Sequence, residues 1–546
     1  MNLARTPAVR LGVSASERAL GSDWIRGVLS VLLGATLLAY LAAFLGISVA
    51  RILYPYPLDD LEDVALTEVQ RILAGQPIYV APTLEYVPLI YGPVYFYLSA
   101  AIASVTGPGF GSLRLVATLA SAASMACAAL LVRRETGSPA AALLAAGLLA
   151  ATYPLVNGAM SAGRTDSTCI FFLLAMLYVI RPAPRVAWWA VGASGALAGL
   201  ALLTKQSSIP VVLAALVYLV CVAPRQVRAF VLAACVTVGV PMVLLSAQSD
   251  GWALFYLWDL PRRHELRPDL LSTFWRADVL PYMTVALLFG PVFLIARALA
   301  RDWKVILFYA LVTASMLASA WAPRANIGGA RNVLLPAYAM LAILAGLGLH
   351  EAVAQLRSSN RANTRAFGAY ALLVGLFQCL VLVYGPRAMA PYRSDLWADE
   401  RMANKLAELQ GSIFAPSYGG YLTVTRSSQQ PDIGALQELT GAYGGSMTPQ
   451  GRQWLAELRA ALERRQYDYI LLGPESTAFL LNGVILEGGY VRAGPLFPPD
   501  DQVWLWRRSG HDVPPGMYIT PKADVYVPWE RASSPAGQIS SRPAES

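Results

Sequence analysis

A cluster of carboxylates marks the part of this sequence most able to do chemistry. Asp59, Asp60, Glu62 and Asp63 place four acidic side chains within five positions. Because like charges this close resist full ionisation, one carboxylate could accept a proton from an attacking hydroxyl, or the group could bind a divalent cation. The same acids would also suit the first turn of a helix, where the helix dipole favours negative charge. A catalytic base and a helix cap therefore both remain open at this stage.

Cationic residues occur in three further polar segments between apolar stretches. These segments contain Arg164 and Asp166, then Lys205, then Arg331 and Asn332 after a Gly-Gly pair. A charge at the centre of a spanning helix costs roughly 2.5–3.5 kcal/mol and less near the interface, so such residues need a partner or a function. They could form local ion pairs or helix caps. Guanidinium and backbone N–H groups gathered at one surface could instead bind a phosphate.

The elements that must position these residues are membrane-spanning helices. Hydrophobic residues make up 56% of the 546-residue sequence and charged residues 14%, with a mean hydropathy of +0.49, against about 25% charged residues in a typical globular chain. Crossing the hydrocarbon core takes roughly 17–25 apolar residues. The sequence predicts eleven spans, at 27–49, 112–132, 139–156, 167–180, 186–203, 208–223, 229–247, 279–297, 304–321, 333–349 and 367–385.

The basic residues predict how these helices are oriented. If the N-terminal tail, residues 1–26, is cytoplasmic, every short turn on the same side is basic, with its positive charges at 133–134, 181–185, 225–228, 297–304 and 357–365. Cytoplasmic loops carry an excess of Lys and Arg, so this orientation is the one we expect. The acidic cluster and the cations Arg164, Lys205 and Arg331 then face the extracytoplasmic side.

Two segments on that predicted outer side, 51–111 and 248–278, are longer than simple turns. In the first, apolar residues recur at helical spacing over 64–73 and predict an amphipathic helix that Gly75-Gln76-Pro77 ends. Residues 91–105 are aromatic-rich and short, which favours a helix lying in the membrane interface. The predicted membrane domain, 27–385, includes both segments.

The composition changes after residue 385, where a small extracytoplasmic α/β domain is predicted over 386–508. Its expected helices are 396–409 and 450–465, and its expected strands are 411–417, 467–473 and 503–507. Residues 509–546 are rich in Pro and Ser and indicate a mobile tail. The fold class is thus an α-helical polytopic membrane protein with a small α/β C-terminal domain.

Several other classes of site are not indicated. All five cysteines fall inside predicted spans, so no extracytoplasmic disulfide framework is expected, and the three histidines have no zinc-type spacing. The net charge of +8 comes from residues beside the spans rather than from one patch. This distribution argues against a nucleic-acid partner.

The polar segments and their order resemble the GT-C glycosyltransferases, in particular bacterial relatives of the protein mannosyltransferases (glycosyltransferase family 39-like) and aminoarabinose transferases. The resemblance covers about 50–385. It is carried by PLDDLEDVALTEVQRILAGQPIYV from 57, YGPVYFYLSA from 91, GSLRLVATLASA from 111, SAGRTDSTCIFFLLAMLYVI from 161, LALLTKQSSIP from 200 and GGARNVLLPAYAML from 328.

This resemblance implies a function and residue roles. It implies transfer of a hexose or pentose from a polyprenyl-phosphate donor to an extracytoplasmic glycan, lipid or protein, with inversion, at a bacterial inner membrane. Asp59 is the implied catalytic base, with Asp60 and Glu62 as neighbours, and the choice between Asp59 and Asp60 stays open. The implied phosphate-binding and supporting residues are Arg164, Lys205, Arg331, Asp166, Asn332 and Tyr91. No cofactor follows with certainty, and a divalent cation stays open.

One departure from the family pattern bears on the donor. Some members have a Lys before a Pro-Pro pair in the first loop, whereas this sequence reads Ile90-Tyr91-Gly92-Pro93. The residues leave two alternative functions open, a ligase or polymerase of surface glycans and a non-catalytic lipid or sugar transporter. A transporter would favour ionisable residues near the membrane midplane and a repeated half, and the sequence shows neither.

Overall fold

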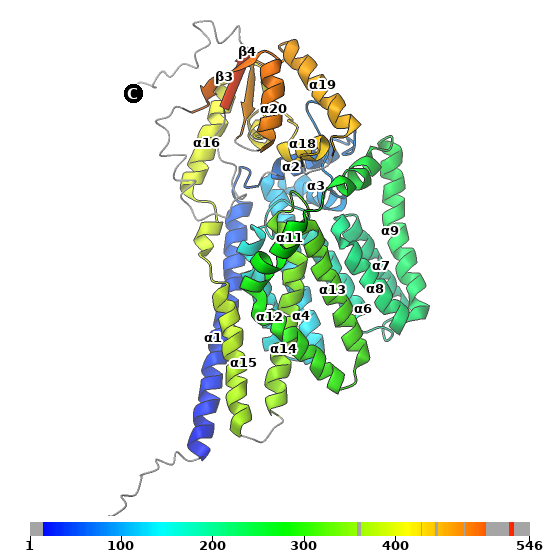
Figure 1. Cartoon of the computed structure of the whole chain (residues 1–546), viewed down its shortest axis with the longest axis vertical. Helices are drawn as coiled ribbons and strands as arrows, with labels where there is room; N and C mark the ends of the chain where they lie inside the picture. The colour runs from blue at the N-terminus through cyan, green and yellow to red at the C-terminus, as the bar shows by residue number, and fades with distance from the viewer. Residues whose placement is uncertain are drawn as a thin grey trace, which may run out of the picture.

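The protein consists of a helical membrane domain and a small α/β domain at one end of it. The computed structural model describes residues 15–59, 61–357, 362–426, 428–442, 446–473, 476–497 and 524–528. In Figure 1 the long helices run side by side, with α1 and α15 along one edge and α9 along the other, and the α/β domain lies at the end that also holds α2 and α3.

Every predicted span is helical in the structure. The corresponding helices are α1 (Ala15–Ile52), α4 (Phe110–Thr136), α5 (Pro139–Ala151), α6 (Asp166–Ile180), α7 (Trp188–Leu202), α8 (Ile209–Val222), α9 (Val227–Gln248), α12 (Leu280–Leu299), α13 (Trp303–Arg324), α14 (Leu335–Arg357) and α15 (Ala362–Val381). Among the described residues, six helices are long and apolar enough to cross a membrane, or seven if α15 and the bent segment after it form one span. The protein is therefore a multi-pass membrane protein, and the number of eleven spans stays a prediction.

The difference in number comes from four short helices. Helices α5 to α8 have 13 to 15 residues each, which corresponds to about 20–23 Å at 1.5 Å per residue. A full crossing needs about 30 Å. Short 3₁₀ segments extend two of these helices, namely η1 (Tyr153–Val156) after α5 and η2 (Gln206–Ser208) before α8.

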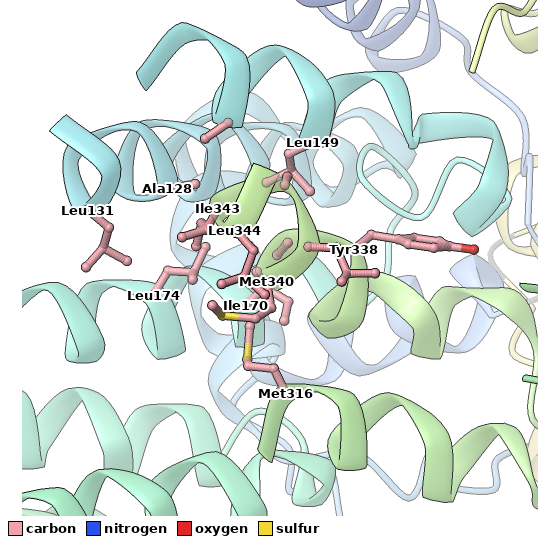
Figure 2. Close-up of a cluster of buried hydrophobic side chains, with 14 of the residues drawn as sticks. Ala128, Leu131, Leu149, Ile170, Leu174, Met316, Tyr338, Met340, Ile343 and Leu344 are labelled. Carbon is pink, nitrogen blue, oxygen red and sulfur yellow. The ribbon is translucent and has the colours of Figure 1, made fainter. Parts of the chain in front are cut away.

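Helix α14 is the centre of the membrane domain. In its apolar window, 89% of the residues are buried, compared with 11% for the helix that includes α9. Figure 2 shows side chains of α4, α5, α6 and α13 gathered around Tyr338, Met340, Ile343 and Leu344 of α14. A Cβ on Gly348 would lie 2.1 Å from the carbonyl oxygen of Phe289. Because Gly348 has no side chain, α14 can pack closely against the backbone of α12, as small residues allow in membrane helix pairs.

Two long loops lie at the end of the membrane domain next to the α/β domain. The first contains α2 (Glu62–Leu73) and α3 (Val94–Thr106), at the two positions predicted for an amphipathic and an interfacial helix. The chain leaves α2 at Gly75, whose φ of +70° is in the region that glycine tolerates best. The second loop is built from short turns of helix, α10 (Trp252–Leu254), η4 (Phe255–Asp259), η5 (Pro261–Arg263), α11 (Pro268–Thr273) and η6 (Phe274–Val279).

The C-terminal domain has one four-stranded sheet with helices around it. Its strands are β1 (Ile413–Phe414), β2 (Tyr469–Leu472), β3 (Tyr490–Pro495) and β4 (Asp524–Pro528), and its helices are α16 (Arg393–Glu408), α17 (Gly419–Arg426), α18 (Ile433–Thr440), α19 (Pro449–Glu463) and α20 (Ser476–Glu487). The sheet order is β1-β2-β4-β3. Strand β1 is parallel to β2, and β4 is antiparallel to both of its neighbours.

One prediction for this domain is wrong. Residues 524–528 belong to the segment expected to be a mobile tail, yet they form β4 between β2 and β3. Val525, Tyr526 and Val527 are all buried there, so a short apolar run inside a Pro/Ser-rich segment completes the sheet. The predicted strand 503–507 and the rest of that segment lie outside the described residues, as does the start of the N-terminal tail.

Candidate active site

Asp59 lies in the turn that leads into α2 and is almost fully buried. Its Oδ1 accepts hydrogen bonds from Arg164 Nε at 2.7 Å and from the backbone N–H of Leu61 at 3.1 Å. Arg164 Nη2 lies 2.6 Å from the same oxygen. The carboxylate thus both caps the turn and pairs with a cation from a distant segment. Asp60 lies outside the described residues.

Arg164 is positioned by the backbone beside it. The N–H of Gly163 donates to Glu62 Oε1 at 2.8 Å. A Cβ at Gly163 would come within 3.0 Å of both Glu62 and Leu113. This close approach of the 163–164 backbone to α2 brings the guanidinium to Asp59.

Glu62 fixes the loop instead of facing an open space. It forms a two-pronged ion pair with Arg114 of α4, with Arg114 Nε 2.9 Å from Oε1 and Arg114 Nη2 2.5 Å from Oε2, and both side chains have no exposed surface. Its Oε2 also accepts from the N–H of Leu58 at 2.9 Å. Burial alone would raise the pKa of Glu62, but the charge and hydrogen bonds of Arg114, the charge of Arg51 and the Leu58 N–H together outweigh burial and lower it. Glu62 therefore stays ionised at neutral pH.

A third ion pair joins Lys205 to Asp166, two residues along the chain from Arg164. Lys205 Nζ is 2.6 Å from Asp166 Oδ1, and Asn332 Nδ2 donates to both oxygens of Asp166 at 3.0 Å. Lys205 Nζ also lies 5.5 Å from the ring centroid of Tyr91. Burial would lower the pKa of Lys205, but the charge and hydrogen bond of Asp166, together with Tyr91, outweigh burial and raise the pKa. Lys205 is consequently a permanent cation in a mostly buried setting.

Tyr91 reaches Lys205 because the backbone before α3 approaches the backbone after α7. A Cβ at Gly92 would lie only 1.9 Å from the carbonyl oxygen of Leu203, and the N–H of Val94 donates to that oxygen at 3.3 Å. Only glycine fits at this contact. The glycine of Ile90-Tyr91-Gly92-Pro93, where the sequence departs from the Lys-Pro-Pro pattern, therefore joins the first loop to Lys205.

Arg331 adds a cation beside this arrangement. It begins η7 (Arg331–Leu334), directly before Asn332, and is partly exposed. Its guanidinium makes no hydrogen bond or ion pair with any described residue. Asp59 pairs with Arg164 and Asp166 pairs with Lys205, whereas Arg331 has no carboxylate partner among the described residues.

Two cavities adjoin the ion pairs. A small one has polar walls from Arg164 to Asp166 on one side and apolar walls on the other, from Leu61, Ala65, Leu89, Tyr91, Tyr95 and Phe96. A much larger groove of about 720 Å³ runs between α3, α7 and α9. Its lining is almost entirely apolar and includes Pro93, Leu203 and Pro241. Since Pro93 and Leu203 flank the Gly92 contact, the groove reaches the residues next to Tyr91 and Lys205.

The C-terminal domain covers the first loop. The N–H of Gly420 at the start of α17 donates to Asp63 Oδ2 at 2.7 Å, and Trp454 Nε1 donates to the carbonyl of Thr83 at 2.8 Å. A Cβ on Gly420 would lie 2.0 Å from Asp63. The fourth residue of the acidic cluster thus anchors the C-terminal domain to α2.

The structure brings most of the predicted site residues together from separate segments. Asp59 with Arg164, and Asp166 with Lys205, Asn332 and Tyr91, form two groups that adjoin the same small cavity. Within the described ranges, no set of three or more His, Cys, Asp or Glu side chains is arranged to hold a metal ion. Sequence reasoning missed Arg114. The available signal was that Arg114 is the only charged residue in the stretch GSLRLVATLASA.

Comparisons with known proteins agree with this architecture. The sequence profile of the dolichyl-phosphate-mannose-protein mannosyltransferase family matches residues 88–246. Among solved structures, apo ArnT from Cupriavidus metallidurans is similar with a TM-score of 0.57 at 13% identity, over 91% of this chain and 98% of that chain. The chain has the GT-C fold. The resemblance seen in the sequence is thereby confirmed.

Two further structures with the GT-C fold contain lipid phosphates. ArnT from the same organism bound to undecaprenyl phosphate matches with a TM-score of 0.56 at 13% identity, over 90% of this chain and 97% of that chain. The archaeal oligosaccharyltransferase AglB from Archaeoglobus fulgidus, in complex with an inhibitory peptide and a dolichol-phosphate, matches with a TM-score of 0.51 at 11% identity, over 82% of this chain and 71% of that chain. No curated protein sequence matches the chain. The family match spans Tyr91, Arg164, Asp166 and Lys205.

Proposed function

We propose that this chain is a membrane glycosyltransferase that moves a sugar from a polyprenyl-phosphate donor to a hydroxyl of an extracytoplasmic acceptor. The observation that supports it best is the buried pairing of Asp59 with Arg164 beside Lys205, at the end of an apolar groove. A carboxylate, two cations and a hydrophobic channel are the parts that this reaction needs. The family match and the lipid phosphates bound to ArnT and AglB, two proteins with the same fold, support this donor class.

The two parts of the donor, its prenyl chain and its sugar phosphate, would occupy different environments. The prenyl chain suits the apolar groove between α3, α7 and α9, where burial of each CH₂ contributes about 0.8 kcal/mol. The phosphate then lies toward Lys205, Arg164 and Arg331. The sugar would be directed at Asp59, which the Arg164 contact places next to the phosphate-binding cations.

In the proposed reaction, Asp59 removes the proton of the acceptor hydroxyl as its oxygen attacks the anomeric carbon. The bond between that carbon and the phosphate oxygen breaks, and the polyprenyl phosphate leaves with the electron pair. The configuration at the anomeric carbon is inverted. The leaving phosphate changes from a diester to a more highly charged monoester, so Arg164 and Lys205 stabilise the transition state more than the bound donor.

Arg164 would couple donor binding to the base. In the structure its guanidinium is held by Asp59, and a base in an ion pair is a weak proton acceptor. A phosphate entering the site competes for the same guanidinium, since Arg binds phosphate through two parallel hydrogen bonds. Asp59 would then be released only when the donor is present, which limits unproductive proton transfer.

Glu62 would act as a positioning residue in this scheme. Its two oxygens hold Arg114, Gly163 and Leu58, so it fixes both the turn with Asp59 and the backbone next to Arg164. Asp166 and Asn332 would hold Lys205 in the same way. The basic turns predict that this face lies outside the cytoplasm, and the resemblance to bacterial proteins implies that the membrane is a bacterial inner membrane.

Mass spectrometry of lipid-linked sugars and cell-envelope glycans, with and without the gene, tests the function and names the substrates. Loss of one glycan together with accumulation of its polyprenyl-linked precursor is the expected result. Unchanged glycans together with an unchanged pool of lipid-linked sugars would argue against a transferase. Loss of polymer length alone would point to a polymerase.

A further inference from the structure

A second large cavity lies in the C-terminal domain, away from the apolar groove. It is a cleft of about 590 Å³ between the first loop and the end of the sheet that carries β1. One wall is formed by Leu84 and Glu85 of the first loop. The opposite walls come from the C-terminal domain, namely Gly411, Ser412, Ile413, Leu422, Arg426, Ser428, Gln429, Gln430, Gln466 and Tyr467.

The polar groups of this cleft are mostly neutral. Gln429 and Gln466 make no side-chain hydrogen bond to the part of the chain that the structure describes, so their amides are available to a ligand. Arg426 is already engaged, because its guanidinium donates to backbone carbonyls of Leu406, Leu409 and Gly411. Amides both donate and accept hydrogen bonds, which matches ligands whose hydroxyls do the same.

The edge of the sheet disfavours a peptide in this cleft. β1 is the outer strand, and an open edge strand would normally be able to pair with an extended peptide. Here Gln430 occupies that edge: its Oε1 accepts from the N–H of Ala415 at 3.0 Å and its Nε2 donates to the carbonyl of Ile413 at 3.1 Å. The backbone groups that a peptide strand would use are therefore taken by a side chain.

Two rigid connections join the cleft to the candidate active site. Helix α17 contacts Asp63 through Gly420, and its residues Leu422 and Arg426 line the cleft about 3 and 9 Å further along the helix axis. The loop with Glu85 continues to Leu89, whose N–H donates to the buried Glu68 of α2 at 2.9 Å. Both walls of the cleft are thus fixed to α2, the helix that Asp59 precedes.

We infer that this cleft binds the carbohydrate part of the acceptor, so that the acceptor of the proposed transferase is a glycan or a glycan-bearing lipid. The acceptor role rests on the proposed function, whereas the preference for a carbohydrate rests on the lining of the cleft. Neutral amides, a single exposed carboxylate and a blocked strand edge favour an uncharged oligosaccharide over a peptide. The lipid-linked donor and the hydrophilic acceptor would then enter from different sides.

The test uses the purified full chain in lipid nanodiscs on an array of defined neutral and acidic oligosaccharides, with a matched peptide array. We expect one class of neutral oligosaccharides to be retained. Gln429→Ala combined with Gln466→Ala should weaken retention about tenfold or more, since two hydrogen bonds are lost. Gln453→Ala, a change of an exposed glutamine on α19 outside the cleft, is the matched control and should bind as wild type.

Three other outcomes of the array experiment would contradict the inference. Retention of no oligosaccharide, equal retention by the double variant, or retention of a peptide that the double variant loses would overturn the inference. The Asp59→Asn variant separates it from the proposed function, because this change should leave array binding intact while transfer stops. If Asp59→Asn transfers as wild type while the double variant still loses oligosaccharide, catalysis by Asp59 fails and the cleft stands.

Discussion

The Glu62–Arg114 pair gives the sharpest prediction about what holds the site. Glu62→Gln keeps the size and shape of the side chain but removes its charge and puts an N–H donor where an acceptor was. Both partners are fully buried and their closest atoms are 2.5 Å apart. The change would leave the Arg114 guanidinium inside the protein without an anion.

The expected loss can be worked from these contacts. Removing one partner of a buried ion pair typically costs about 3–5 kcal/mol. Arg114 keeps its hydrogen bonds to the carbonyls of Arg51 and Tyr54, which favours the lower half of that range. In addition, the amide nitrogen would face either the N–H of Leu58 or the N–H of Gly163, two donors that now point at an acceptor. We expect about 3–4 kcal/mol of lost stability.

The assay is denaturant unfolding of the purified protein in mixed micelles, followed by tryptophan fluorescence. Glu85→Gln, the same chemical change at an exposed position of the same loop, is the control and should shift stability by less than about 0.5 kcal/mol. Our reasoning fails if Glu62→Gln unfolds like wild type while transfer is lost. That result would make Glu62 a participant in the chemistry.

Three further predictions concern other contacts. Lys205→Gln should lower kcat/KM for the lipid-linked donor about 10- to 100-fold, because a charge-assisted contact to phosphate is lost. Gly92→Ala should destabilise the protein by about 1–3 kcal/mol and reduce transfer, because its Cβ would meet the carbonyl of Leu203. Raising the pH from about 6 to about 9, a range that includes the ordinary histidine pKa, should weaken the His264–Glu438 contact. We expect α18 to become more mobile as a result, which hydrogen exchange would measure.

The sign of the pH effect follows from both partners of that contact, whose atoms lie 2.5 Å apart. Burial lowers the pKa of His264, but the hydrogen bond to Glu438 and the charge of Glu438 together outweigh burial and raise the pKa. Burial also raises the pKa of Glu438. The folded state therefore holds these protons more tightly, and the contact weakens as the pH rises above about 6.5. His264→Gln combined with Glu438→Gln should abolish this dependence; an unchanged pH profile in that double variant would contradict the assignment.

Controls exist for the first two of these variants. Gln206→Ala leaves the charge of the Lys205 segment intact and tests whether any change in that turn is harmful. Gly107→Ala changes a glycine whose Cβ would meet no atom within 4 Å, although its φ of +89° adds backbone strain. If Gly92→Ala is tolerated better than Gly107→Ala, the close approach to Leu203 does not position the site.

The elements of the membrane domain were largely predictable because each follows from local pattern. Apolar runs predicted the spanning helices, and apolar residues at helical spacing over 64–73 predicted α2. What the sequence could not give was pairing. Arg164 and Asp166 are two residues apart, and their spacing suggests a mutual ion pair. Instead, Arg164 pairs with Asp59 and Asp166 pairs with Lys205, because the packed helices bring these partners from distant parts of the sequence.

The C-terminal domain was harder to predict for a related reason. Strands β1 and β4 have only two and five residues, too few for a periodic signal, and β4 joins the sheet from a segment whose composition favours disorder. The contact of Gly420 with Asp63 also has no local signature, since a glycine that must let a carboxylate approach looks like any turn glycine. Long-range packing, rather than local preference, decides these features.

The central claim is that Asp59 is the base of a sugar transfer from a lipid phosphate. Its most direct test is the initial rate of transfer from a radiolabelled polyprenyl-phosphate sugar to envelope acceptors by Asp59→Asn and, in parallel, Asp60→Asn protein in nanodiscs. We predict that Asp59→Asn slows transfer by about 10²- to 10⁴-fold, while donor binding stays near wild type. Transfer by Asp59→Asn at the wild-type rate would contradict the account.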